Sequence, residues 1–120
     1  MSEFSEQVIV MDFARSNQNT YPDLKYLFHI PNGGNRDIVT ASRLKRAGVK
    51  KGVPDLFLPV SNHHFNGLCI EMKDVGGVVS PEQADWLEFL NRQGYKAVVC
   101  YSGKEAIAIT VNYLETARCL

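Results

Sequence analysis

The sequence predicts an α/β fold in which helices flank a central mixed β-sheet, in the order α-β-α-β-β-α-β-α. Helix signals, namely apolar spacing, capping residues and terminal glycines, mark four segments: residues 3–16, 36–47, 81–93 and 103–117. Strand signals, namely short apolar or alternating runs, mark four others: residues 25–30, 55–60, 67–73 and 95–101. The length of 120 residues, 45% of them apolar, suits one domain, so we expect residues 1–120 to form a single domain.

The first helix and the first strand are separated by a proline. Phe4, Val8 and Met11 recur at the spacing of one helix face. Pro22 interrupts this pattern, and the run KYLFHI that follows at residues 25–30 predicts a short strand.

A glycine-containing segment leads into the second helix. Asn32, Gly33 and Gly34 favour a turn, because glycine adopts positive φ without steric cost. The same residues can instead present backbone N–H groups to a phosphate, which we favour modestly. Asn35 is placed to cap the helix over residues 36–47, and Gly48 to end it.

The second and third strands are predicted to form a hairpin, because the polar tip SNHHFN joins them. Residues two apart on a strand share a face of the sheet. Glu71 and Lys73 therefore project together, opposite the apolar face formed by Leu68, Ile70 and Met72.

The third helix has a complete start signal. Ser80 is the expected N-cap, Pro81 suits the first helical position, and Gln83 completes a capping box. Trp86 and Leu90 belong to its apolar stripe. The strand that follows is nearly continuous in apolar residues, which is typical of a central position in the sheet, and one more helix completes the chain.

Composition indicates a protein of a reducing compartment. The three cysteines, Cys69, Cys100 and Cys119, form no CxxC pair, so neither a disulfide framework nor a four-cysteine zinc site is expected. The acidic start is unlike a signal peptide, and no apolar run approaches the roughly 20 residues that span a bilayer. We expect a cytoplasmic protein without a membrane partner.

The charges are unevenly distributed, although thirteen basic and thirteen acidic residues balance overall. Residues 36–51 hold six basic side chains and one acid, a net charge of +5, and the rest of the chain carries −5. Such a stripe can hold a phosphate backbone. From charge alone, a solvated helix face explains it equally well. The DNA-binding candidates in it are Arg36, Arg43, Lys45, Lys50 and Lys51.

Three charged residues converge on the hairpin. Asp55 begins one strand, and Glu71 and Lys73 lie on the next. Two carboxylates on neighbouring strands, with the backbone carbonyl of Met72 between Glu71 and Lys73, can bind a hard cation such as Mg²⁺ or Mn²⁺. Such a cation polarises a phosphodiester and lowers the pKa of a bound water, while Lys73 offsets developing negative charge. The alternative is an exposed cross-strand ion pair without chemistry.

Other reactive side chains carry weaker signals. His29, His63 and His64 lack the spacing of a zinc site, so we expect no histidine-bound metal. The cysteines are expected to act as small apolar residues. Cys69 shares a face with Glu71 and is expected to line the site without acting as a nucleophile.

Several longer runs carry a resemblance to a known family. GVKKGVPDLFLPV, GLCIEMKDVGGVVSPEQADWLEFL and GYKAVVCYSGKEAI, with HIPNGGNR and SEQVIVMDFAR upstream, resemble the VRR-NUC family of the PD-(D/E)XK nuclease superfamily. The resemblance runs from about residue 5 to about residue 114. It is closest to the compact stand-alone members found in phages and bacteria.

The resemblance implies a restriction-endonuclease-like fold and a Mg²⁺- or Mn²⁺-dependent endonuclease without a small-molecule cofactor. By position, Asp55 and Glu71 match the metal ligands and Lys73 the catalytic lysine. Glu6 matches an acidic position near the metal, and Gln83 a glutamine at the start of the helix after the ExK strand. The stand-alone members that the chain resembles are similar to homodimeric enzymes. These enzymes act on branched DNA such as four-way (Holliday) junctions in replication, repair and recombination.

Two of these assignments have structural alternatives. Glu6 can be a first-turn acid favoured by the helix dipole. Gln83 is already explained as a capping residue, and the two roles can compete for one side chain. For the whole protein, the alternatives are a flap or nicking nuclease that acts with a replication or repair partner, and a non-catalytic DNA-binding module.

Overall fold

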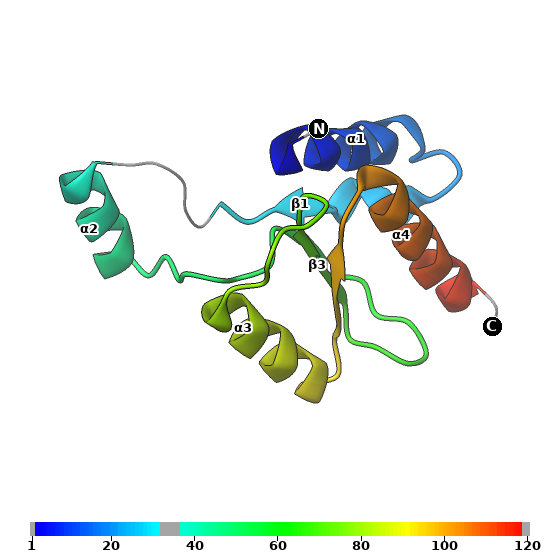
Figure 1. The fold of residues 1–120 in the computed structure, drawn as a ribbon. Helices are drawn as coiled ribbons and strands as arrows, with labels where there is room; N and C mark the ends of the chain where they lie inside the picture. The colour runs from blue at the N-terminus through cyan, green and yellow to red at the C-terminus, as the bar shows by residue number, and fades with distance from the viewer. Residues whose placement is uncertain (1, 32–36, 119–120) are drawn as a thin grey trace.

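The structure is a computed structural model that describes residues 2–31 and 37–118. The predicted order of helices and strands is confirmed, with a 3₁₀ helix, η1, as an addition (Figure 1). The elements are α1 (Glu3–Ser16), η1 (Pro22–Tyr26), β1 (Phe28–His29), α2 (Ile38–Arg46), β2 (Leu56–Leu58), β3 (Leu68–Met72), α3 (Pro81–Arg92), β4 (Lys96–Cys100) and α4 (Gly103–Arg118).

The sheet is mixed, as predicted, with the strand order β1-β2-β3-β4. The strand over residues 95–101 was predicted to be central, but β4 lies at an edge of the described sheet. The pairs β1–β2 and β2–β3 are antiparallel, and β3–β4 is parallel. Helix α3 makes the crossover that two parallel neighbours require. In this register Ile70 of β3 lies opposite Leu56 of β2 and Val98 of β4, so β3 is a central strand.

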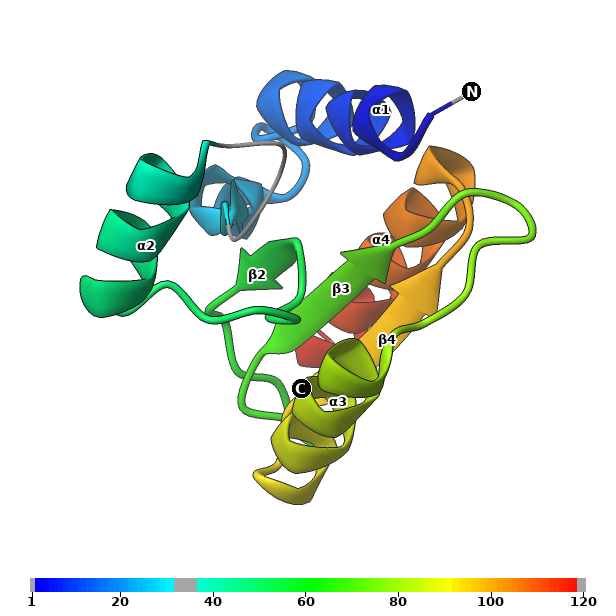
Figure 2. The ribbon, with the colours of Figure 1, turned by 60° about the vertical axis from the view of Figure 1, so that its left-hand side comes forward.

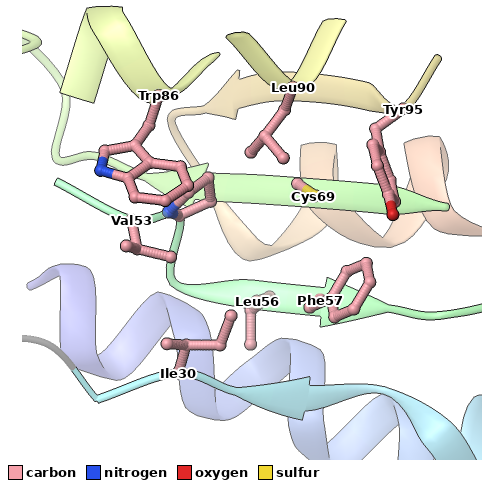
Figure 3. A pocket seen from close by; sticks show the side chains of 9 residues that line it. Ile30, Val53, Leu56, Phe57, Cys69, Trp86, Leu90 and Tyr95 are labelled. Atoms are coloured by element: carbon pink, nitrogen blue, oxygen red, sulfur yellow. The ribbon is translucent and has the colours of Figure 1, made fainter. Parts of the chain in front are cut away.

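Helices cover both faces of the sheet (Figures 2 and 3). Helices α1 and α4 lie together behind one face, and α3 lies over the other. All five residues of β3 are buried, including those on the face that carries Glu71. The hairpin was expected to place one apolar face against a core, whereas α3 in fact covers the second face as well.

The hydrophobic core lies between the sheet and the α1–α4 pair. The sheet contributes the alternate side chains of β2 and β3, all fully buried: Leu56, Leu58, Leu68, Ile70 and Met72. The helices contribute Val10 and Ala14 from α1, and Ala106, Tyr113 and Leu114 from α4. The Tyr113 hydroxyl donates to the Val60 carbonyl at 2.6 Å, so its polar group stays hydrogen-bonded inside the core.

The predicted strand over residues 25–30 is wrong in most of its length. Residues Pro22–Tyr26 form the 3₁₀ helix instead, with Pro22 at its start, and only Phe28 and His29 pair with β2. Leu24 and Leu27 are the buried side chains, and their spacing of three suits a helical turn better than a strand. The run was predicted as a strand, although the spacing of its buried residues is helical.

The second helix starts later than predicted. It spans Ile38–Arg46, and Asp37 is its N-cap, with a 2.7 Å bond from the Thr40 N–H to Asp37 Oδ1. The predicted cap Asn35 lies outside the described residues. The predicted stop at Gly48 is confirmed, since Gly48 adopts φ +108° and its N–H donates to the Lys45 carbonyl at 3.1 Å.

Helix α2 projects from the body of the protein (Figure 1). None of its residues is buried, in contrast to α1 and α4. The segment that follows α2 returns along the N-terminus of α3, where Gly52 adopts φ +91°. A Cβ at Gly52 would lie 2.6 Å from the Glu82 carbonyl carbon, so only glycine allows this close approach. Within the described ranges, no helix has the length and apolar character needed to cross a membrane.

Candidate active site

Asp55 and Glu71 come together because their strands are antiparallel neighbours. Asp55 directly precedes β2, and its Oδ2 accepts a hydrogen bond from the Met72 N–H of β3 at 2.8 Å. The Asp55 carbonyl in turn accepts from the Ile30 N–H at 2.8 Å. Both the side chain and the backbone of Asp55 are therefore held by adjacent strands. Glu71 lies beside it in β3 and is only 3% exposed.

Burial and the neighbouring Asp55 carboxylate both disfavour the charged form of Glu71. The pKa of Glu71 is raised from 4.5 to about 8, first by burial and then by the charge of Asp55. The positive charge of Lys73 acts in the opposite direction but is outweighed. Without a cation, Glu71 is therefore largely protonated at neutral pH.

Lys73 lies just beyond the end of β3 and is only 8% exposed. Its N–H donates to the Cys100 carbonyl of β4 at 2.9 Å, which extends the parallel pairing by one residue. The next turn is closed by a 2.8 Å bond from the Gly77 N–H to the Asp74 carbonyl. A Cβ at Gly77 would lie 3.5 Å from Lys73 Cδ, so this turn packs against the aliphatic part of the lysine. The charge is thus positioned at the carboxylate pair.

Gln83 caps α3 and contacts Glu71 at the same time. Its Oε1 accepts from the Ser80 N–H at 2.9 Å, and its N–H donates to Ser80 Oγ at 3.2 Å, which confirms the capping box. Its Nε2 donates to Glu71 Oε2 at 3.3 Å. The cap and the contact with Glu71 do not compete for the side chain, because the amide has two ends. The cap therefore fixes the orientation in which Gln83 contacts the site.

The structure places Glu6 and Glu3 of α1 differently. The Glu6 carboxylate accepts a 2.8 Å hydrogen bond from the Gly103 N–H, at the start of α4. Glu3, one turn earlier, is the α1 residue whose charge contributes to the raised pKa of Glu71. Sequence reasoning overlooked Glu3, and its only signal was the position three residues before Glu6.

Substituting Glu6 tests what this carboxylate does. We expect Glu6→Ala to lower the free energy of unfolding by about 0.5–2 kcal/mol, as for other lost helix caps, and to change DNA cleavage by less than about threefold. Thermal unfolding and a cleavage assay on the same preparation measure both. Glu3→Ala is the matched control, and we expect the reverse pattern. A loss of cleavage in Glu6→Ala at unchanged stability would assign Glu6 to the metal site instead.

The donor set at the carboxylate pair fits a hard divalent cation. All its side-chain acceptors are carboxylate oxygens, which Mg²⁺ and Mn²⁺ prefer. Among the described residues no group of three His, Cys, Asp or Glu side chains gathers for a metal, so backbone and water oxygens must supply the remaining ligands. Met72 is bound to Asp55 through its N–H, and its carbonyl is the predicted backbone ligand. A cation here also relieves the repulsion that raises the pKa of Glu71.

The cysteines near the site are protonated at neutral pH. Burial raises the pKa of Cys69 to about 11 and that of Cys100 to about 12. A thiol needs a lowered pKa to act as a nucleophile. Neither cysteine is therefore suited to act as a nucleophile.

The predicted DNA-binding residues do not gather at the carboxylate pair. Arg43 and Lys45 lie on α2, away from the body (Figure 1). Lys50 and Lys51 are exposed in the segment after it, and Lys51 Nζ lies 3.5 Å from Glu82 Oε1. The remaining candidates, Asn32, Gly33, Gly34 and Arg36, lie outside the described residues.

An apolar hollow of about 220 Å³ lies beside the site, between α3 and the sheet (Figure 3). Trp86 and Leu90 point into it from α3, and Leu56 and Phe57 border it from β2. The hollow adjoins the carboxylate pair, because Cys69 lines the hollow and lies two residues before Glu71 on the same face of β3.

The comparisons with known proteins agree with this fold. The family model described as VRR-NUC domain matches residues 6–104. A solved structure described as "VRR_NUC domain protein" superposes with a TM-score of 0.82 and 29% sequence identity, covering 98% of this chain and 91% of that one. No curated protein sequence matches the chain. The chain therefore belongs to the VRR-NUC family, a PD-(D/E)XK-like nuclease domain with DNA as its substrate.

Proposed function

We propose that this protein is a Mg²⁺- or Mn²⁺-dependent endonuclease that hydrolyses phosphodiester bonds in branched DNA, such as four-way junctions, during replication, repair or recombination. The observation that carries the proposal is the buried Glu71 carboxylate beside Asp55, flanked by Lys73 and Gln83. A buried carboxylate with a raised pKa beside a second carboxylate is costly to the fold and is typical of a functional site. A non-catalytic DNA-binding module has no need of it.

Each residue of the site has a distinct role in this proposal. Asp55, Glu71 and the Met72 carbonyl bind the cation, which supplies polarisation of the scissile phosphodiester and a bound water of lowered pKa. Gln83 orients Glu71 through its Nε2. Lys73, which lies beside the carboxylates, stabilises the negative charge that develops on the phosphate.

A preference for DNA shape is supported by the kind of contact that the basic residues suit. The basic residues on α2 and after it suit phosphate contacts, which position a duplex without reading its sequence. A homodimer with two sites related by a two-fold axis suits paired incisions in a symmetric junction. We therefore propose a homodimer that selects branched structures.

A panel of labelled substrates tests the proposal. Wild-type protein is incubated with a four-way junction, a flap, a nicked duplex and a linear duplex, each with Mg²⁺, with Mn²⁺ and with EDTA. We expect metal-dependent, paired incisions in the junction at a rate at least about tenfold above that on the linear duplex. Preferential cutting of the flap or the nicked duplex would replace the branched-junction assignment. Binding of DNA without cleavage of any substrate would contradict the proposed activity.

A further inference from the structure

We infer that α2 of one copy of this protein docks on the apolar hollow between α3 and the sheet of a second copy, so that two copies exchange their α2 helices. This inference rests on the homodimer proposed above and names the surface that forms it.

Helix α2 is not packed into the part of its own chain that the structure describes. It has nine residues, and none of them is buried. Isolated helices shorter than about 12–15 residues are marginal in water, so most of their stability comes from packing. Ile38 is 87% exposed, and with Ala41 and Leu44 it forms a stripe along one side of the helix. A short helix with an exposed apolar stripe therefore needs a surface to cover it.

The α3 side of the sheet has the complementary feature, an apolar hollow that is partly open to the surface. Helices α1 and α4 cover the opposite face, whereas among the described residues α3 is the helix that lies over this one (Figure 3). Ile30 and Val53 also line the hollow. Its volume of about 220 Å³ is below the roughly 300–1,000 Å³ of small-molecule pockets, so apolar side chains of a partner suit it better than a metabolite.

The exposed aromatic surface continues along α3. Phe89 is 44% exposed and, with Trp86 and Asp85, lines a second hollow of about 250 Å³. Aromatic side chains of this kind are enriched in protein interfaces. The two hollows lie along one helix, so a helix from another molecule can contact both.

The charges of the two surfaces are opposite. Helix α2 carries Arg43, Lys45 and Arg46 and no acid between Ile38 and Arg46. Helix α3 carries three acids, Glu82, Asp85 and Glu88, against one basic residue, Arg92. Lys45 lies at nearly the same helical angle as Ile38, so it flanks the apolar stripe and can pair with an acid of α3. Arg43 and Arg46 lie on the other side of α2 and stay free for DNA.

A second copy is the occupant because the chain's own α2 stands elsewhere. The segment after α2 is held at the start of α3 by the close approach of Gly52 and by the Lys51–Glu82 ion pair. Helix α2 precedes this segment and projects outward, away from α3 and from the hollow of its own chain (Figure 1). Two copies that exchange α2 make the same contact twice around a two-fold axis, which stabilises a dimer at little structural cost.

The first test is the mass in solution of the wild-type protein and two matched variants. Ile38→Asp places a charge in the proposed contact, and Val39→Asp places the same charge on the opposite side of α2, at a residue that is 68% exposed. Neither side chain is packed in the core, so both variants should fold. We expect wild type and Val39→Asp to sediment at twice 13.5 kDa, and Ile38→Asp to dimerise at least about tenfold more weakly.

Cross-linking separates exchange from a helix that folds back on its own chain. One tagged chain carries Ala41→Cys and another carries Phe89→Cys, both with Cys119 replaced by serine, and a short thiol cross-linker is added to their mixture. We expect a covalent heterodimer that fails to form when either introduced cysteine is omitted.

In a chain with both substitutions, a cross-link confined to the monomer would overturn the exchange. A dimer unaffected by Ile38→Asp and not cross-linked would overturn this surface but leave the homodimer standing. A wild-type monomer at every concentration would overturn both, while the cleavage assay remains an independent test of the nuclease.

Discussion

Replacing Lys73 with methionine is expected to lower the rate of DNA cleavage by about 10²–10³-fold, with a change in DNA affinity of less than about threefold. Methionine keeps an unbranched apolar chain of similar length, so the turn that packs against Lys73 Cδ retains its contact. The substitution thus removes the charge while preserving the fold. The expected loss is that of one electrostatic contact made in the transition state.

Single-turnover cleavage at saturating protein measures the chemical step, and DNA binding is measured separately in EDTA. Lys50→Met is the matched control, because it removes one exposed lysine that belongs neither to the carboxylate pair nor to the proposed dimer contact. For this control we expect weaker DNA binding and an unchanged single-turnover rate. Equal cleavage rates for Lys73→Met and wild type would show that Lys73 has only a structural role.

Local patterns in the sequence predicted the parts of the site that depend on short spacing. The capping box of Ser80 and Gln83 is set by neighbouring residues, and it forms as expected. Glu71 and Lys73 share a strand face for the same reason. The approach of Asp55 to Glu71 required one further step, the recognition of a hairpin, which the polar tip between two apolar runs made possible.

Features that depend on packing between distant elements were not predictable in this way. Glu3 reaches the field of Glu71 only because α1 packs across the sheet, and nothing in its local sequence distinguishes it from Glu6. The run around Leu24 and Leu27 is apolar in either conformation, so composition could not separate a 3₁₀ turn from a strand. The exposure of α2 could not be predicted either, because periodicity shows that a helix has an apolar stripe but not what covers it.

Replacing Glu71 with glutamine is expected to stabilise the metal-free protein above neutral pH and to abolish its response to Mg²⁺. The pKa of Glu71 is about 8 in the folded protein and ordinarily 4.5. Between these values the folded protein retains a proton that the unfolded chain releases, so the stability of the wild type falls as pH rises from about 4.5 to 8. Glutamine does not titrate, and this decline should disappear from the variant.

We expect a divalent cation to reverse which of the two proteins, wild type or Glu71→Gln, is the more stable. Bound between Asp55 and Glu71, a cation takes the place of the proton and stabilises the charged pair, so Mg²⁺ should raise the melting temperature of the wild type. The variant lacks one carboxylate and should show little increase. Removal of the cation with EDTA should therefore destabilise only the wild type.

Thermal unfolding from pH 5 to 9, with EDTA and with Mg²⁺, measures both effects at once. Each kcal/mol of stability corresponds to roughly 3–6 °C for a chain of this size. Glu88→Gln is the matched control, since Glu88 is exposed on α3, where it pairs with Arg92 at 3.2 Å, and its curves should follow the wild type. If Glu71→Gln also follows the wild type in EDTA and in Mg²⁺, then Glu71 is not a metal ligand, whatever the outcome of the cleavage assay. If the variant is stabilised in EDTA and unresponsive to Mg²⁺, then repulsion between the Asp55 and Glu71 carboxylates explains why the metal-free wild type is less stable.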